Sequence, residues 1–161
     1  MSIDYAMAKT GQRMDVPVND MIPLGDPDEV RAVVSRTFPE LDWSGHKRAP
    51  SVGVVFGVDQ VFDFCLHYER MYVDWEAIAR EGRLPTDDEA ARAHSGDGAV
   101  VMVFVHFSRG SNFIKRMRTL CQENGWTLWD MQTGKVVDFN DEDQHTVHES
   151  KVEDMVRRLH E

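Results

Sequence analysis

The sequence predicts a single α+β domain, spanning residues 1–161, in which helices pack on an antiparallel or mixed sheet. Its length of 161 residues, with 42% hydrophobic and 29% charged residues, is that of one ordinary globular domain. Strand-like runs follow one another without a helix between them, which favours antiparallel pairing. Two amphipathic helices separate these runs. The expected order is β-α-β-β-(excursion)-β-α-β-β-α.

The first elements are a short strand over residues 3–8 and, after a loop, a helix that begins near Asp26. Asp26 is the expected N-cap, Pro27 suits the first helical position, and Glu29 completes a capping-box pattern. The helix should end before Pro39. Apolar residues at helical spacing predict its buried face: Val30, Val33, Val34 and Phe38.

A β-hairpin is expected next, with strands over residues 52–56 and 61–68 joined by a turn at 57–60. Alternate residues of a strand point to opposite faces of the sheet. In the second strand the even-numbered residues are the core candidates, and they are Phe62, Phe64, Leu66 and Tyr68.

Residues 69–98 contain few large apolar side chains and are interpreted as a surface excursion from the domain. A short helix carrying Trp75 should end near Gly82. Thr86 and Glu89 have the spacing of a capping box and predict a second short helix.

The strongest strand signal is the apolar run at 99–107, and a helix should follow it with Ser111 or Asn112 as its cap. Asn124-Gly125 is a typical helix end. The apolar face of this helix should comprise Phe113, Ile114, Met117, Leu120 and Cys121.

The C-terminal part predicts a second hairpin, with strands at 126–131 and 136–139 around a turn at 132–135. A last helix is expected from about Thr146 or Ser150 onward.

The net charge of the chain indicates which classes of partner it can bind. The formal net charge is −10, from 28 acidic and 18 basic residues, and this repels nucleic-acid phosphates and anionic membranes. A basic protein surface is the partner class that such a charge favours. The N-terminus has no signal-peptide pattern, and no apolar run approaches the roughly 20 residues of a membrane span. We therefore expect a cytoplasmic protein with reduced thiols at Cys65 and Cys121.

No complete catalytic or metal-binding motif is recognisable. His145 and His148 lie near Glu149 but lack the His-Glu-x-x-His order of metalloproteases, and the acidic run before them lacks the pattern of a calcium loop. His67 and His106 could be neighbours across the sheet and could form a paired site with Asp63 or Glu69. Whether any of the four histidines has a role stays open. The expectation is a protein that is not an enzyme, with no cofactor, no metal site and no catalytic residues.

The sequence Asn-Gly-Trp-Thr-Leu-Trp-Asp-Met-Gln-Thr-Gly at 124–134 carries a resemblance. Together with Phe38-Pro-Glu-Leu-Asp-Trp43 and the hairpin after it, this segment resembles small bacterial proteins whose domain closes on such a pattern. The matching positions, Trp126, Trp129, Asp130 and Gly134, are structural. Some members of this group look like immunity proteins, which neutralise toxins delivered by type VI or contact-dependent secretion. The resemblance excludes residues 69–98 and the C-terminal tail.

The predicted function is therefore that of an immunity protein that occludes the active site of a cognate toxin, a protein basic at the contact surface. Acidic side chains would steer association, and aromatic side chains would anchor it. The candidate partner-binding residues are Asp87, Asp88, Glu89, Asp138, Asp141, Glu142, Asp143, Trp43 and Trp75. Two alternatives remain open, a small metal-dependent hydrolase that uses histidines and carboxylates, and a regulatory adaptor domain. The oligomeric state is not predicted.

Overall fold

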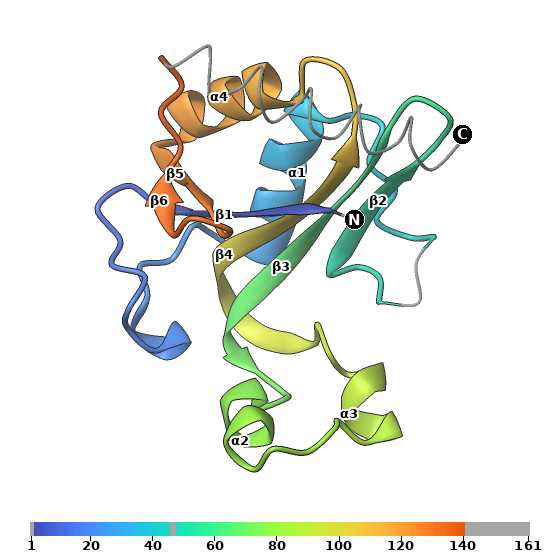
Figure 1. Ribbon diagram of the computed structural model, residues 1–161, viewed down its shortest axis with the longest axis vertical. Coiled ribbons are helices and arrows are strands. Elements are labelled where there is room, and N and C mark those ends of the chain that lie inside the picture. Colours follow the sequence, from blue (N-terminus) through green and yellow to red (C-terminus); the bar gives the residue numbers. More distant parts are fainter. Residues whose placement is uncertain (1, 46–47, 141–161) are drawn as a thin grey trace.

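The computed structural model describes residues 2–45 and 48–140, and its centre is a six-stranded sheet in which each strand pair is antiparallel (Figure 1). The order across the sheet is β2-β3-β4-β1-β5-β6. The strands are β1 (Ile3–Lys9), β2 (Val52–Phe56), β3 (Val61–Met71), β4 (Gly96–Arg109), β5 (Trp126–Asp130) and β6 (Lys135–Val136). The fold class is thus the predicted α+β class.

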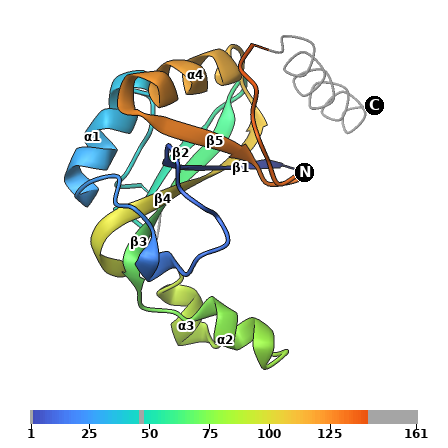
Figure 2. The same ribbon diagram turned by 90° about the vertical axis from the view of Figure 1, so that its left-hand side faces the viewer.

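Two main helices, α1 (Pro27–Thr37) and α4 (Phe113–Asn124), pack side by side on one face of this sheet (Figure 2). The predicted apolar face of α4 is buried along its whole length. In α1, Val30 and Val34 are buried and Val33 is half-buried. The even-numbered side of β3 faces these helices, as the alternation predicts. Phe38 lies between both layers, with its ring 4.9 Å from Phe64 and 5.7 Å from Phe113.

The opposite face of the sheet has a smaller apolar cluster. Ala6 and Ala8 of β1 and Val101 and Met102 of β4 are buried there, beneath Met21 and other side chains of the segment that follows β1. This segment contains a short 3-10 helix, η1 (Val18–Asp20), that the sequence does not predict. The small alanine side chains let the segment approach the strands closely.

Several predicted boundaries are wrong. Between β3 and β4, hydrogen-bonded pairing continues beyond the apolar runs. β3 and β4 pair as far as Met71 and Gly96, so the excursion comprises residues 72–95 rather than 69–98. β6 is only two residues long, not four. The predicted last helix lies outside the described residues.

Some of the predicted helix caps form and others do not. Neither Asp26 nor Asn112 makes a side-chain capping hydrogen bond, although each occupies an N-cap position. The capping box of Thr86 and Glu89 is complete, and Gly125 ends α4 with a φ of 67°. Over the described residues, no helix is long and apolar enough to cross a membrane.

Candidate functional site

The excursion forms a projecting arm, defined here as residues 72–95, at the end of the long β3–β4 hairpin (Figure 1). It contains two short helices, α2 (Trp75–Arg80) and α3 (Asp87–Ala91). Val73, Ile78 and Ala93 are buried and give the arm a small apolar interior. The backbone N–H of Tyr72 donates to the carbonyl of Ser95 at 3.0 Å, which closes the arm at its base.

The arm exposes three large apolar side chains. Tyr72 is 52% exposed, Trp75 is 39% exposed and Leu84 is 87% exposed. The indole N–H of Trp75 donates to the carbonyl of Ala93 at 3.4 Å, so the ring is held at a defined place while much of it faces solvent. Tryptophan and tyrosine are enriched among the residues that contribute most to the binding energy of protein interfaces.

The three predicted acidic residues of the arm have different surroundings. Glu89 accepts hydrogen bonds from the backbone N–H of Thr86 and from Arg83, whose Nη1 lies 2.7 Å away. These contacts, Arg83 first, lower the pKa of Glu89 to about 2. Asp88 pairs with Arg92 at 2.6 Å. Asp87 is exposed, and neither it nor Glu76 of α2 makes an ion pair with another described residue.

Trp43 is not the freely exposed aromatic anchor that its loop position suggests. Its indole N–H donates to the Ser35 hydroxyl at 2.9 Å, and its ring covers Gly53, where an added Cβ would lie 2.8 Å from the ring. The side chain is half-buried against the main core. A side chain larger than glycine at position 53 would displace this ring, so Trp43 has a packing role. A contact between Trp43 and a partner stays a prediction.

The second acidic stretch lies partly outside the described residues. Asp138 is exposed, and its carboxylate accepts a hydrogen bond from the backbone N–H of Asn140 at 2.9 Å. Asp141, Glu142 and Asp143 are not among the described residues. The same holds for His145 and His148.

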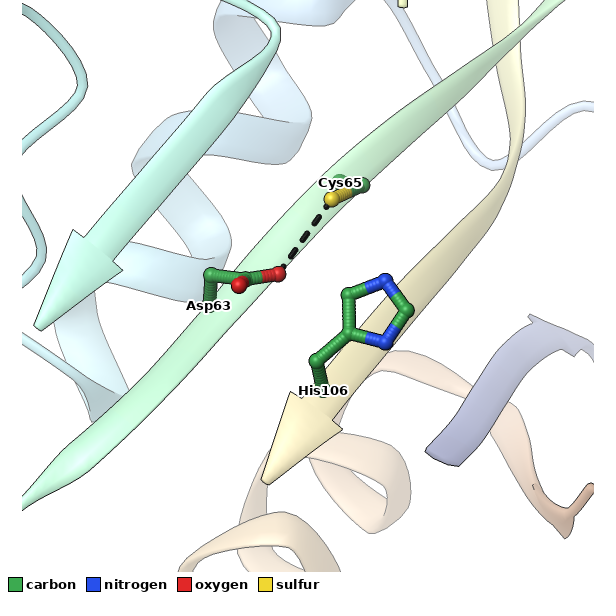
Figure 3. Close-up of side chains that lie close together, drawn as sticks. All are labelled: Asp63, Cys65 and His106. Atoms are coloured by element: carbon green, nitrogen blue, oxygen red, sulfur yellow. Dashed lines mark hydrogen bonds between the residues drawn. The ribbon is translucent and has the colours of Figure 1, made fainter. Parts of the chain in front are cut away.

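A second candidate group, of potential metal-ligating side chains, lies on the sheet face opposite the helices (Figure 3). Asp63 and Cys65 of β3 and His106 of β4 place one carboxylate oxygen, the thiol sulfur and one ring nitrogen within 4.8 Å of one another. The Cys65 thiol donates to Asp63 at 3.3 Å. His106 Nδ1 lies 2.8 Å from a carboxylate oxygen of Asp4 in β1. We call Asp63, Cys65 and His106, with Asp4, the sheet-face cluster.

The strand registers bring this cluster together. Asp63 and Cys65 are two residues apart and therefore share a face of β3. His106 is directly opposite Asp63 in the β3–β4 ladder, and Asp4 is directly opposite His106 in the β1–β4 ladder. The sequence alone allows a site of His67 and His106 with Asp63 or Glu69, but it does not indicate Cys65 or Asp4 as members. The members come from three strands that are distant in the chain, whereas motif searches detect local spacing.

Burial determines the protonation state of both cysteine thiols. It is the main reason why the pKa of Cys65 lies above its ordinary value, and the neighbouring Asp63 carboxylate raises this pKa further. Burial alone raises the pKa of Cys121, in α4, to about 12. Both thiols are therefore protonated at neutral pH, and neither has the lowered pKa of a catalytic nucleophile.

His67 does not form the pair with His106 that the sequence left open. Phe104 lies between them, stacked on the His67 ring at 5.2 Å and 6.0 Å from the His106 ring. The pKa of His67 is lowered to about 4, mainly by burial and further by the nearby His94 and His106. His67 is thus a neutral, packed histidine at neutral pH.

A pocket of about 390 Å³ lies between the arm, the start of α1 and the loop before β2. Arg31, Arg48 and His94 are among its lining residues, and the Ser51 and Tyr68 hydroxyls hydrogen-bond to each other at 2.6 Å within it. Arg31 already pairs with Asp28, and it donates to the carbonyl of Pro50 at 3.4 Å. The pocket therefore offers fewer free donors than its composition indicates.

Comparison of the chain with protein-family models, with curated proteins and with solved structures finds no match. The arm and the sheet-face cluster are accordingly identified by their own geometry and chemistry.

Proposed function

We propose that this protein is an immunity protein, a protein-binding module that neutralises a cognate secreted toxin by covering the active site of that toxin. The observation that carries the proposal is the projecting arm, which presents Tyr72, Trp75 and Leu84 to solvent among carboxylates. Exposed large apolar residues gathered on one projection are typical of a protein-contact surface.

The charge of the arm supports a basic partner. Residues 72–95 include six acidic and three basic side chains. The arginines Arg83 and Arg92 are engaged by Glu81, Glu89 and Asp88 within the arm. Glu76 and Asp87 are left to act outward, and the net charge of −10 adds long-range attraction for a cationic protein.

This arrangement gives each part of the arm a role in binding. The apolar side chains would supply the desolvated centre of the interface, and the carboxylates would form a rim that steers association. A toxin that acts on nucleic acid or another anionic substrate has a cationic cleft, and an acidic projection is suited to enter and occlude it. Residues 38–68 and 100–139 resemble small bacterial proteins, some of which look like immunity proteins, and this resemblance favours the same class.

The test uses the protein encoded by the neighbouring gene as the probe, because immunity genes lie beside their toxin genes. We expect the two proteins to co-purify and the full chain to protect cells that express the neighbour. Leu84→Asp should abolish both effects, since it places a charge on the most exposed large apolar side chain of the arm. The matched control is Val58→Asp, because Val58 is also 87% exposed but lies in the turn at the other end of β3.

A charge experiment separates steering from anchoring. Glu76→Lys with Asp87→Lys should lower the association rate at low salt, and the loss should shrink as salt screens the interaction. Asp59→Lys, in the β2–β3 turn, is the matched control for Asp87→Lys alone, because each reverses the charge of one exposed aspartate. Glu89 is left intact because its replacement would disturb α3 itself.

The Leu84 and Val58 variants also have an outcome that would contradict the proposal. If Leu84→Asp binds like the parent and Val58→Asp loses binding, the interface lies at the opposite end of β3 and not on the arm.

A further inference from the structure

We propose that the sheet-face cluster binds one divalent transition-metal ion of the zinc class, ligated by Asp63, Cys65 and His106, with Asp4 as a positioning residue. This site goes beyond the proposed toxin-binding role and does not depend on it. The three possible ligand atoms come from two adjacent strands and lie within 4.8 Å of one another on the sheet face opposite the helices (Figure 3).

The distances suit a small tetrahedral ion after minor adjustment. Zinc bonds of about 2.3 Å to sulfur and 2.0–2.2 Å to oxygen or nitrogen place neighbouring tetrahedral ligands about 3.6 Å apart. The sulfur of Cys65 and an oxygen of Asp63 are already 3.3 Å apart. The remaining separations do not exceed 4.8 Å, so binding would require side-chain rotations that bring the ligand atoms closer together.

Asp4 supplies an independent reason to regard the cluster as a metal site. Metal-ligating histidines commonly hydrogen-bond a carboxylate through the nitrogen that does not bind the ion, which fixes the ring and its tautomer. Asp4 contacts Nδ1 of His106 at 2.8 Å. This contact leaves Nε2 as the nitrogen available for the ion, and it comes from a third strand, β1, which carries none of the three ligands.

The donor set and its exposure indicate which ion would bind. On binding, the Cys65 thiol would release its proton to solvent and ligate the ion as a thiolate. A thiolate, an imidazole and one carboxylate favour zinc or cobalt over calcium or magnesium, which prefer oxygen ligands alone. Cys65 is buried, whereas the side chain of His106 is 40% exposed and Asp63 is half-buried. An ion can therefore enter from solvent past Asp63 and His106. Three protein ligands leave a fourth tetrahedral position for a water molecule.

Cobalt(II) titration of the untagged, metal-free full chain tests the site, because a cobalt–thiolate bond gives a charge-transfer absorption band in the near ultraviolet. We expect saturation at one cobalt per chain and displacement by zinc. Cys65→Ser should abolish the band, whereas Cys121→Ser should keep it, because Cys121 is the other buried thiol and lies in α4. His106→Gln and Asp63→Asn should each lower the affinity at least tenfold, and Asp59→Asn should not.

The positioning role of Asp4 has its own signature. Asp4→Asn should weaken cobalt affinity by about 10–100-fold while the charge-transfer band survives at saturation, since the ligands themselves are unchanged. Far-ultraviolet circular dichroism establishes that each variant is folded. If Cys65→Ser fails to fold, the half-exposed His106→Gln variant carries the test.

Three results would overturn the proposal: no saturable binding, a thiolate band that survives Cys65→Ser, or cobalt binding abolished by His145→Gln with His148→Gln and unaffected by His106→Gln. None of these results bears on the arm, because the titration involves no protein partner. Failure of the metal site and failure of the immunity function are thus distinguishable.

Discussion

Glu89 shows how one carboxylate can hold a short helix in place. Its side chain accepts from the backbone N–H of Thr86 and from Arg83, and the Thr86 hydroxyl accepts from the Glu89 backbone N–H at 3.1 Å. A helix of five residues is too short to be stable alone, so these contacts define where α3 begins.

The ionised state of Glu89 should therefore be detectable by titration. Its pKa is lowered in the folded protein to about 2, below its ordinary value, so its contribution to stability is present above about pH 4.5 and is lost as the pH falls toward 2. We expect side-chain carbon chemical shifts in nuclear magnetic resonance to give a midpoint near 2. Arg83→Gln should raise this midpoint, since Arg83 is the main cause of the shift.

Arg92→Gln is the matched control, because Arg92 pairs with Asp88 one residue before Glu89. It should leave the Glu89 midpoint unchanged. A midpoint near the ordinary glutamate value in the parent protein would show that the hydrogen bonds to Thr86 and Arg83 do not persist in solution.

At the residue scale, the sequence predicts contacts between residues close in the chain better than contacts between distant residues, and not every local prediction holds. The capping box of Thr86 and Glu89 follows from spacing within four residues, and the structure confirms it. The same pattern at Asp26 and Glu29 predicts a capping bond that is not formed, although Pro27 does begin the helix. His106 and Asp63 meet only because β3 and β4 pair in one register, which no local spacing reveals.

At the scale of elements, α4 is the helix that sequence periodicity describes best. Its five predicted apolar residues are all buried, because a helix on a sheet face must bury one continuous stripe. Strand ends were less predictable. The β3–β4 hairpin continues through the paired residues Arg70 and Asp97, although the apolar alternation has already stopped there. These two residues form an exposed ion pair, with Arg70 Nε and an Asp97 oxygen 2.5 Å apart.

The packing of α4 predicts a large cost for shortening its buried side chains. Leu120 is fully buried between α4 and the sheet. Leu120→Ala should lower the free energy of unfolding by about 2–5 kcal/mol, from lost burial and the cavity left behind. Urea denaturation followed by circular dichroism measures this change.

Leu84→Ala removes the same atoms from a side chain that is 87% exposed, and it should change stability by less than about 0.5 kcal/mol. Equal effects of the two substitutions would mean that α4 is not packed on the sheet as described.

At the scale of the whole molecule, β1 organises the sheet. It is the first strand in the chain but lies between β4 and β5, so both of its edges are hydrogen-bonded. The order of elements along the chain was predictable, because each element has its own local signal. The strand order was not, because the placement of β1 depends on contacts with residues about a hundred positions away.

This topology predicts an uneven distribution of local stability. Amides of β1 and β4 lie in the interior of the sheet, whereas α2 and α3 are short helices on a projection with a small interior. Local opening is easiest where few apolar groups are buried. Hydrogen–deuterium exchange should therefore be slowest in Ile3–Lys9 and in the paired part of Gly96–Arg109, and much faster in the arm.

The same measurement separates the two proposed sites. Added zinc should slow exchange around Asp63, Cys65 and His106 and leave the arm unchanged, because an ion that binds only the folded state suppresses local opening near its ligands. A bound toxin should instead protect amides of the arm.

The free protein tests the prediction of uneven local stability. If amides of the arm exchange as slowly as those of β4, the arm is part of the rigid core. Its exposed Tyr72, Trp75 and Leu84 would then be presented on a fixed surface rather than on a locally mobile one.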